Sequence, residues 1–516
     1  MDDRLRLADL LGGLSLVSDL GYGLPTETAL RTCIIGTELA RRMDLSEPEV
    51  ADVFYVSLLF HVGCPAYSHE AAELFGDDLA VNHAAVAADL TDLRDVFTTF
   101  IPESTRGLPP ARRALGAVRM ATRGRAFGKA HNQASCEVAR AVARRIGLAP
   151  TVSDGLYDIH EWWNGAGARS ARGEAIARCA RVARVASEAA ELIGLHGREA
   201  VGHALPRRAG KTLDPRVVER FTAEADGIVD AATAGDPRQR VLELEPEPAV
   251  EIGASDLPAI AHAFGDLADL KTPFTHGHSA SVARLSVAAA HHLALDRRTV
   301  EVLEIAAYLH DLGSIGVSNQ VWERSGPLTT GERERAQLHA YYSERILAST
   351  PVLTPMAAVA GMHHERLDGS GYHRACRGEA IGISARVLAC ADAFQAMTQH
   401  RPHRQALPAD RARAVLLDET RAGRFDPDAA AAVLDAADDG HPVRRQEVRP
   451  RGLTDREVEV LRLVADGCSN PEIGRRLGIS RRTAEHHVQH VYTKIGVSTR
   501  AAAALFALEH DLLHRH

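Results

Sequence analysis

Histidine and aspartate side chains that could bind metal ions are concentrated in one part of the chain. They are His278, the adjacent pair His310 and Asp311, His339, the adjacent pair His363 and His364, and Asp392. Neutral imidazoles and carboxylates suit borderline divalent metals such as iron, manganese or zinc. A bridging carboxylate with several histidines can hold two ions, activate a bound water and neutralise charge on a phosphoryl group. The pattern therefore predicts hydrolysis of a phosphodiester.

The sequence around these residues resembles an HD-GYP domain over about residues 262–438. The segments that carry the resemblance are KTPFTHGHS, YLHDLG, LHAYYSERIL, HHERLDGSGY and ARVLACADAFQAMTQHRPHR. The resemblance implies an all-helical, metal-dependent phosphohydrolase that acts on cyclic di-GMP or a related cyclic dinucleotide. It implies that one metal is held by His278, His310, Asp311 and Asp392, and that Asp311 bridges to a second held by His339, His363 and His364. His310 and Asp311 would be the catalytic pair, and substrate contacts would come from Arg366, Asp368, Gly371 and Tyr372.

Three positions depart from the family pattern. The form with three metals has Glu four residues before the first histidine, where this chain has Phe274, so we expect two divalent ions. Ser314 stands where the family usually has a lysine near the scissile phosphate, and His373 replaces the proline of the GYP motif. The metal ligands are complete while the surroundings of the substrate are altered.

The last segment, residues 451–516, has the pattern of a helix-turn-helix DNA-binding domain. Thr454 and Glu457 form a predicted capping box, and Gly478 separates a helix over 470–477 from one over 481–495. The run LTDREVEVLRLVADGCSNPEI resembles the LuxR-type domain, although Glu485 stands where that family often has a lysine facing DNA. We expect DNA contacts from Arg481, Arg482, Thr483, His486, Gln489 and Lys494.

Two functions remain open for the protein as a whole. In the first, a DNA-binding transcriptional regulator carries a phosphodiesterase that hydrolyses or senses a cyclic dinucleotide. In the second, the HD-GYP-like body binds nucleotide or metal without turnover and only gates DNA binding. The expected partners are double-stranded DNA and a cyclic dinucleotide. A homodimer is expected because LuxR-type modules bind paired half-sites.

The first part of the chain repeats the HD-GYP-like part in a degenerate form. GEAIARCARVARVASE from Gly173 matches GEAIGISARVLACADA from Gly378, and HEWWNGAG matches HERLDGSG. LFHVGC matches YLHDLG, which would replace the HD pair by His61 and Val62. The other replacements are Ile159-His160 for the HH pair, Ser187 for the last aspartate and the region Ala29–Arg31 for the first histidine, while His131 is a candidate for His339. This copy cannot hold two metals, so it would serve structure, dimerisation or sensing.

The elements that must position these residues are almost all helices. Segments such as Arg284–Leu295 place apolar residues at three-four spacing, and alternating β-branched runs are rare. The predicted fold is all-α, with tandem HD-type domains and a four-helix LuxR-type domain. The domains are 1–235 (degenerate HD), 257–440 (HD-GYP-like) and 451–516, joined by linkers at 236–256 and 441–450.

Composition limits the remaining possibilities. The net charge of −8 argues against a uniformly basic nucleic-acid coat, and the chain has neither an 18-residue apolar run nor a signal-peptide pattern. A cytoplasmic protein without a membrane segment is therefore expected. The seven cysteines are odd in number and contain no CxxC pair, which argues against a disulfide framework or a cysteine zinc site.

Overall fold

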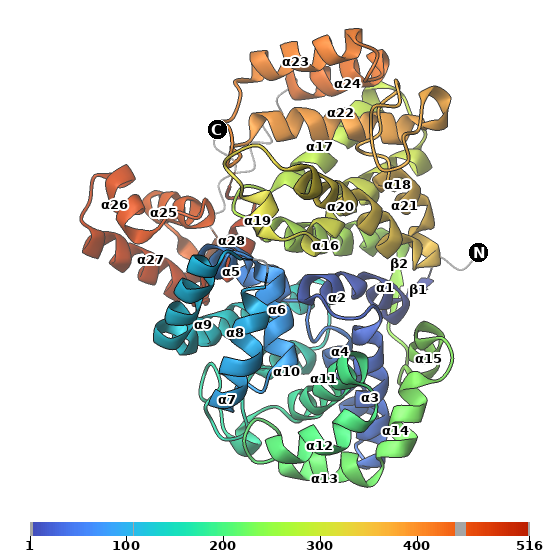
Figure 1. Ribbon diagram of the computed structural model, residues 1–516. Helices are drawn as coiled ribbons and strands as arrows, with labels where there is room; N and C mark the ends of the chain where they lie inside the picture. The colour runs from blue at the N-terminus through green and yellow to red at the C-terminus, as the bar shows by residue number, and fades with distance from the viewer. Residues whose placement is uncertain (1–3, 107, 439–449, 514–516) are drawn as a thin grey trace. The chain divides into compact units, whose positions relative to one another are not determined.

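The computed structural model describes residues 4–106, 108–438 and 450–513, and it divides into two compact units, residues 1–256 and 257–516 (Figure 1). The regular structure of the described residues is helical apart from one small sheet and two isolated β-bridges. In that sheet β1 (Arg4–Arg6) pairs antiparallel with β2 (Glu251–Gly253), with Leu5 opposite Ile252. The predicted all-α class is confirmed, and none of the described helices is long and apolar enough to cross a membrane.

The first unit is built around helices α3, α4 and α11, which pack on one another. Apolar residues such as Ile34, Phe54 and Val185 lie fully buried where these helices meet. The helices of this unit are α1 (Leu7–Leu14), α2 (Leu16–Tyr22), α3 (Thr28–Arg42), α4 (Glu47–Leu58), α5 (Ser68–Phe75), α6 (Asp78–Ala87), α7 (Leu93–Asp95), α8 (Ile101–Ser104), α9 (Pro110–Arg145), α10 (Pro150–Asp158), α11 (Arg178–His196), α12 (Glu199–Arg208), α13 (Pro215–Ala223), α14 (Ala225–Thr233) and α15 (Pro237–Leu244).

The part of the second unit that precedes the C-terminal domain has the same arrangement, since α17 packs against α18 and α22 as α3 packs against α4 and α11. Its core includes Val282, Leu303 and Leu388, all fully buried. The helices that precede the C-terminal domain are α16 (Leu257–Asp269), α17 (His278–His292), α18 (Arg297–Leu309), α19 (Asn319–Trp322), α20 (Thr330–Ala348), α21 (Thr354–Ala360), α22 (Ile383–Thr398), α23 (Ala409–Arg421) and α24 (Pro427–Asp438).

Four further helices form the C-terminal domain around their own apolar core. They are α25 (Asp455–Ala465), α26 (Asn470–Leu477), α27 (Arg481–Ile495) and α28 (Arg500–Glu509). Thr454 and Glu457 make the predicted capping box. Gly478 has the left-handed conformation that the turn between α26 and α27 requires, with φ 66°. The predicted four-helix arrangement is confirmed.

The two HD-type copies share their element order, and the glycine after the HD position sets their register. Helices α3 and α17 have 15 residues each. A Cβ at Gly63 would lie 2.0 Å from the Ser135 carbonyl oxygen, and one at Gly313 would lie 2.2 Å from that of His339. Gly63 therefore corresponds to Gly313.

This register corrects the alignment of the HD motif by one residue. Counting back from the glycines, His61 stands at the position of Asp311, and Phe60 at that of His310. The same contact puts Ser135, rather than His131, at the position of His339. Thr28 begins α3 as His278 begins α17, so the first histidine's position lies just before the predicted Ala29–Arg31. Matching the motifs by their shared histidine caused the shift.

The segment 236–256, expected to be a linker, contains regular structure that belongs to the first unit. Asp236 caps α15 through its side chain, and Pro237 occupies the first position of that helix. Helix α15 packs on α3, and β2 pairs with β1. The other expected linker, 441–450, lies outside the described residues except for Pro450.

Candidate metal centre and DNA-binding helix

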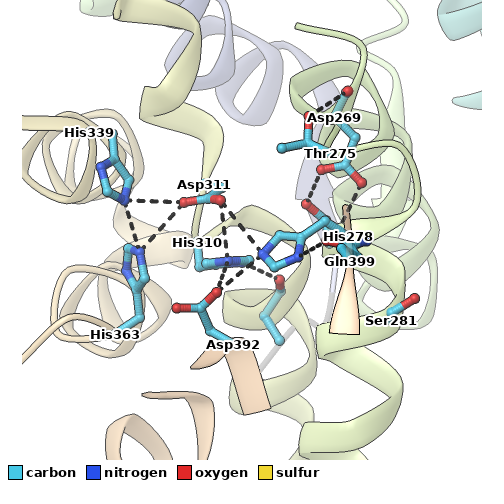
Figure 2. Close-up of polar contacts among 12 residues, drawn as sticks. Asp269, Thr275, His278, Ser281, His310, Asp311, His339, His363, Asp392 and Gln399 are labelled. Atoms are coloured by element: carbon cyan, nitrogen blue, oxygen red, sulfur yellow. Dashed lines mark hydrogen bonds and ion pairs between the residues drawn. The ribbon is translucent and has the colours of Figure 1, made fainter. Parts of the chain in front are cut away.

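The predicted ligands of the second copy converge from five places in the fold. His278 begins α17, His310 and Asp311 follow the end of α18, and His339 lies in α20. His363 and His364 follow the end of α21, and Asp392 lies in α22. Figure 2 shows Asp311 between His339 and His363 on one side and His278 and His310 on the other. Three ligand groups form there: His339, His363 and His364; His278, His310 and Asp392; and His310, Asp311 and His363.

The two carboxylate oxygens of Asp311 face different histidines. Oδ1 lies 3.3 Å from Nε2 of His339 and 3.5 Å from Nε2 of His363. Oδ2 lies 3.6 Å from Nε2 of His310 and 3.8 Å from Nε2 of His278. Two ligands that are each about 2.1 Å from one ion lie about 3.0–3.4 Å apart. The distance to His339 lies in this range and the other three are slightly longer, and each oxygen faces the histidines that would hold one ion.

Hydrogen bonds orient the imidazoles so that their Nε2 atoms face the centre. Nδ1–H of His310 donates to the Ala307 carbonyl at 2.8 Å, and those of His339 and His363 donate to backbone carbonyls in the same way. Their Nε2 atoms therefore carry lone pairs. Nε2 of His310 is buried without a hydrogen-bond partner among the described residues, and the Nε2 atoms of His339 and His363 face each other at 3.1 Å. Facing lone pairs repel unless a cation lies between them, so these residues fit a metal site.

Burial and charge favour the protonation states that metal ligands need. Burial lowers the pKa of His310 to about 4, so its ring is neutral at neutral pH. Burial alone would raise the pKa of Asp311, but His310, His363 and His339 around it hold that pKa well below its usual range. The pKa of Asp392 is also lowered, because His278 and His364 outweigh its burial. The centre thus presents two ionised carboxylates and a neutral His310 ring, whereas Asp392 outweighs burial and raises the pKa of His278 in the absence of metal.

The residues expected to bind substrate lie in the loop after His364. The Tyr372 ring stacks on the His364 ring, with centroids 4.7 Å apart. The Arg366 guanidinium lies over the Phe425 ring and donates to the backbone carbonyl of His363 at 3.2 Å. Gly371 has no room for a side chain, because a Cβ would lie 2.5 Å from the His364 carbonyl oxygen. Asp368 accepts a hydrogen bond from the Ser370 N–H at 2.9 Å.

The two altered positions make ordinary structural contacts. The backbone of Ser314 donates to the Asp311 carbonyl at 2.9 Å and accepts from the Trp322 indole at 3.1 Å. Nε2 of His373 lies 3.2 Å from a carboxylate oxygen of Glu344. The backbone of Ser314 thus helps to fix the turn that carries Asp311.

Gln399 is a residue of the centre that the sequence analysis missed. Its Oε1 lies 3.1 Å from Nδ1 of His278, so it accepts a hydrogen bond from the ring Nδ1–H and leaves Nε2 free for metal. Arg401 donates to the same oxygen at 3.4 Å. Gln399 follows the last turn of α22, where no periodic pattern indicates which side chains point inward.

The first copy keeps the positions of the ligands but few of their side chains. The equivalents of the seven ligands are Thr28, Phe60, His61, Ser135, Ile159, His160 and Ser187. Only His61 and His160 retain a ligating group. Among the described residues of the first unit, no three potential ligands lie close enough together to hold an ion.

Helix α27 presents an exposed polar face, as a recognition helix requires. Arg481, Arg482, Thr483, His486 and Gln489 are all exposed. Two of the predicted contact residues also bind within the domain. Arg481 pairs with Glu485 at 2.8 Å, and Lys494 pairs with Glu457 at 2.7 Å. Lys494 therefore also holds α27 to α25, and its role at DNA stays a prediction.

Comparisons with protein families identify two regions of the chain. Residues 262–429 match the HD domain family, and residues 451–507 match the family described as bacterial regulatory proteins, luxR family. The second match begins at residue 451, where the expected DNA-binding domain begins, and ends at residue 507.

Some known proteins match a larger part of the chain than these two families do. It is 32% identical to 3′3′-cGAMP-specific phosphodiesterase 3 of Vibrio cholerae over 83% of this chain and 94% of that protein. It is 36% identical to a cyclic di-GMP phosphodiesterase of Thermotoga maritima over 28% of this chain and 40% of the relative. A crystal structure of a cyclic GMP-AMP phosphodiesterase of Vibrio cholerae matches with a TM-score of 0.58 and 28% identity, over 84% of this chain and 98% of that one.

Proposed function

The chain belongs to the HD-GYP phosphodiesterase family, and we propose that it is a DNA-binding regulator whose second HD domain hydrolyses a cyclic dinucleotide with two metal ions. The observation that carries this proposal is the convergence of seven candidate ligands, among them Asp311, whose two oxygens face separate pairs of histidines. The long match to a relative named for 3′3′-cGAMP makes that molecule the first substrate to test.

The side chains described above could hold the metals and contact the substrate in such a reaction. When bound, the metals would supply an activated water near neutral pH and would neutralise charge on the phosphoryl oxygens. Asp311 is placed to hold both ions at a fixed separation, and the buried histidines exclude bulk water from them. Tyr372 offers a flat ring beside His364 on which a base could stack.

The altered residues Ser314 and His373 bear on whether the domain hydrolyses a cyclic dinucleotide or only binds it. Neither Ser314 nor His373 replaces the positive charge of the family's lysine. Neutralising the negative charge of the transition state would therefore depend on the metals and on nearby cations. Arg401 is partly buried and lies close enough to Asp311 and Asp392 to interact electrostatically with both. We propose that it supplies part of that positive charge.

The test is metal content and turnover measured on the same samples. Protein purified anaerobically should hold two divalent ions per chain and should linearise 3′3′-cGAMP or cyclic di-GMP. Asp311→Ala should lose both ions and all turnover, because each ion loses a shared ligand while repulsion between the ions is unscreened. His339→Ala should lose mainly one ion.

The matched control is His61→Ala in the first copy, which should keep both ions and full turnover. Metal-free wild-type protein, or an Asp311→Ala variant that retains both ions, would overturn the two-metal proposal. Two ions without turnover of either dinucleotide would favour the alternative, in which the domain binds ligand and gates DNA binding.

A further inference from the structure

The first unit contains a cavity of about 140 Å³ at the place where the second unit has its metal centre. Its lining includes His61, His160 and Ser187, which stand at the positions of Asp311, His364 and Asp392. Nε2 of His61 lies 3.5 Å from Oγ of Ser187. The degenerate copy has therefore kept an internal site while losing its metal ligands.

In this copy, a carboxylate one helical turn further along α11 contacts the residues that stand at the ligand positions. Oε1 of Glu191 lies 3.1 Å from Nε2 of His61 and accepts a hydrogen bond from Ser187 at 2.7 Å. The corresponding position in α22, four residues after Asp392, is Ala396. The imidazole nitrogen that would face an ion is thus already occupied.

Four polar atoms of cavity-lining residues are buried without a hydrogen-bond partner among the described residues. They are Nδ1 of His61, Nδ1 of His131, Nε2 of His160 and Oγ1 of Thr212. His61 and Thr212 are only 3% and 6% exposed. Buried polar groups in folded proteins are nearly always hydrogen-bonded, so these four atoms leave partners to be supplied by water or by a ligand with several polar atoms.

The charged groups of the lining are paired with one another, which disfavours an anionic ligand. Glu188 binds Arg184 at 3.1 Å through Oε1 and Arg208 at 2.8 Å through Oε2. Burial lowers the pKa of His131 to about 4, and that of His160 well below its usual range, so both rings are neutral at neutral pH. An uncharged ligand suits these surroundings better than a phosphate does.

The size and lining of the cavity further limit which ligands it can hold. A cavity of about 150 Å³ holds a single benzene ring, so this cavity of about 140 Å³ matches one small ring system. The aromatic rings of Phe60 and Trp162 form part of the lining. We propose that the cavity binds an uncharged, planar nitrogen heterocycle the size of a free nucleobase.

Calorimetric titration of the full-length, metal-loaded protein tests the proposal, with adenine, hypoxanthine, cytosine and uracil as separate probes. At least one base should bind with a stoichiometry of one per chain, and binding should persist in Asp311→Ala, which alters only the second copy. His160→Phe keeps the ring but removes its nitrogens, and it should weaken binding about tenfold. The matched control His203→Phe, at an exposed histidine of the same unit, should leave binding unchanged.

Thermal unfolding should first establish that His160→Phe is folded. If it is not, Asn132→Leu, at another lining residue, replaces it with the same expected loss. The proposal fails if none of the four bases binds at millimolar concentration, or if binding disappears in Asp311→Ala. It also fails if inorganic phosphate displaces the base, because the site would then be an anion site.

Discussion

At the scale of single residues, the metal centre depends on side chains that do not themselves ligate. Gln399 accepts the Nδ1–H of His278 at 3.1 Å and so selects the tautomer with Nε2 free for metal. The other three oriented histidines use backbone carbonyls for this purpose, which no substitution can remove. Gln399 is therefore the orienting contact that mutation can test most directly.

Gln399→Leu should weaken metal binding about 10- to 100-fold, the usual effect of removing an outer hydrogen bond to a ligating histidine. The loss should fall on the ion that His278 shares with His310 and Asp392. Competition with a chelator, followed by elemental analysis, measures it. Gln405→Leu, at an exposed glutamine of the same loop, is the control and should have no effect. Equal metal affinity in the two variants would show that Gln399 does not orient His278.

The seven expected ligands lie together as the sequence predicted, because each belongs to a short motif of fixed spacing. The sequence could not predict Gln399, because a loop side chain is directed by tertiary contacts and not by periodicity. The register of the first copy was also missed, since Phe60 has replaced a histidine and His61 has replaced an aspartate at the next position. Leu59 and Gly63, which match Leu309 and Gly313, carried the correct register.

At the scale of elements, the C-terminal domain depends on Glu457, which joins two helices. It caps α25 by accepting from the Thr454 N–H at 2.7 Å, and it binds Lys494 of α27 at 2.7 Å. Burial raises the pKa of Glu457, but these donors outweigh it and lower the pKa from 4.5 to about 2. The ionised form is thus stabilised by folding.

Glu457→Gln should destabilise the isolated domain, residues 450–516, by about 1.5–3 kcal/mol at neutral pH, the usual range for a hydrogen bond to a charged group. Because the folded pKa is the lower one, the contribution of Glu457 is present in full above about pH 4.5. It is lost as the pH falls toward about 2. Urea unfolding at several pH values measures both effects, and Glu459→Gln, at an exposed neighbour, is the control. A variant as stable as wild type at pH 7 would contradict this role.

The exposed face of α27 should divide into residues that read bases and residues that bind phosphates. Replacing Gln489 or His486 by Ala should reduce discrimination between sites by about 1–3 kcal/mol if the side chain reads a base edge. Arg482→Ala should weaken binding to all sequences and flatten its salt dependence. Fluorescence anisotropy with selected and scrambled duplexes separates the two effects, and Arg297→Ala, exposed on α18, is the control. Unaltered binding after deletion of residues 451–516 would refute the assignment.

The helices of this domain were predictable because caps, turn glycines and apolar spacing agree there. In the segment 236–256, proline and acidic residues suggested a linker. Asp236 followed by Pro237 is also a helix-start signal, and burial of Val241 and Leu244 decided the outcome. Composition alone did not separate these alternatives, because packing on α3 supplies the stabilisation.

At the scale of the whole molecule, two copies of one helical fold have diverged in what they hold. The second copy combines buried histidines with two ionised carboxylates and fits metal. The first has a His–Glu pair at the same place and fits an uncharged ligand. The helix packing around α3, α4 and α11 tolerates this change, because most of the ligand positions lie at or just beyond helix ends, and only those of His339 and Asp392 lie within helices.

A DNA-binding domain of this size makes few phosphate contacts, so a single copy should bind weakly. LuxR-type domains bind paired half-sites, and the two-fold symmetry of such a site is matched by a protein dimer. We therefore expect two chains on each duplex, with half-sites arranged as an inverted repeat. DNA fragments selected from a random pool with the full-length protein should contain that repeat.

Light scattering with and without the selected duplex measures the number of chains directly. Removing one half-site should abolish the two-chain complex. It should also reduce the affinity for the duplex by more than losing half of the contacts would predict, because binding of the first chain favours binding of the second. A duplex with both half-sites scrambled controls for non-specific binding. A protein that is strictly monomeric both free and on the intact site would rule out the dimer, and recognition would then rest on one helix α27.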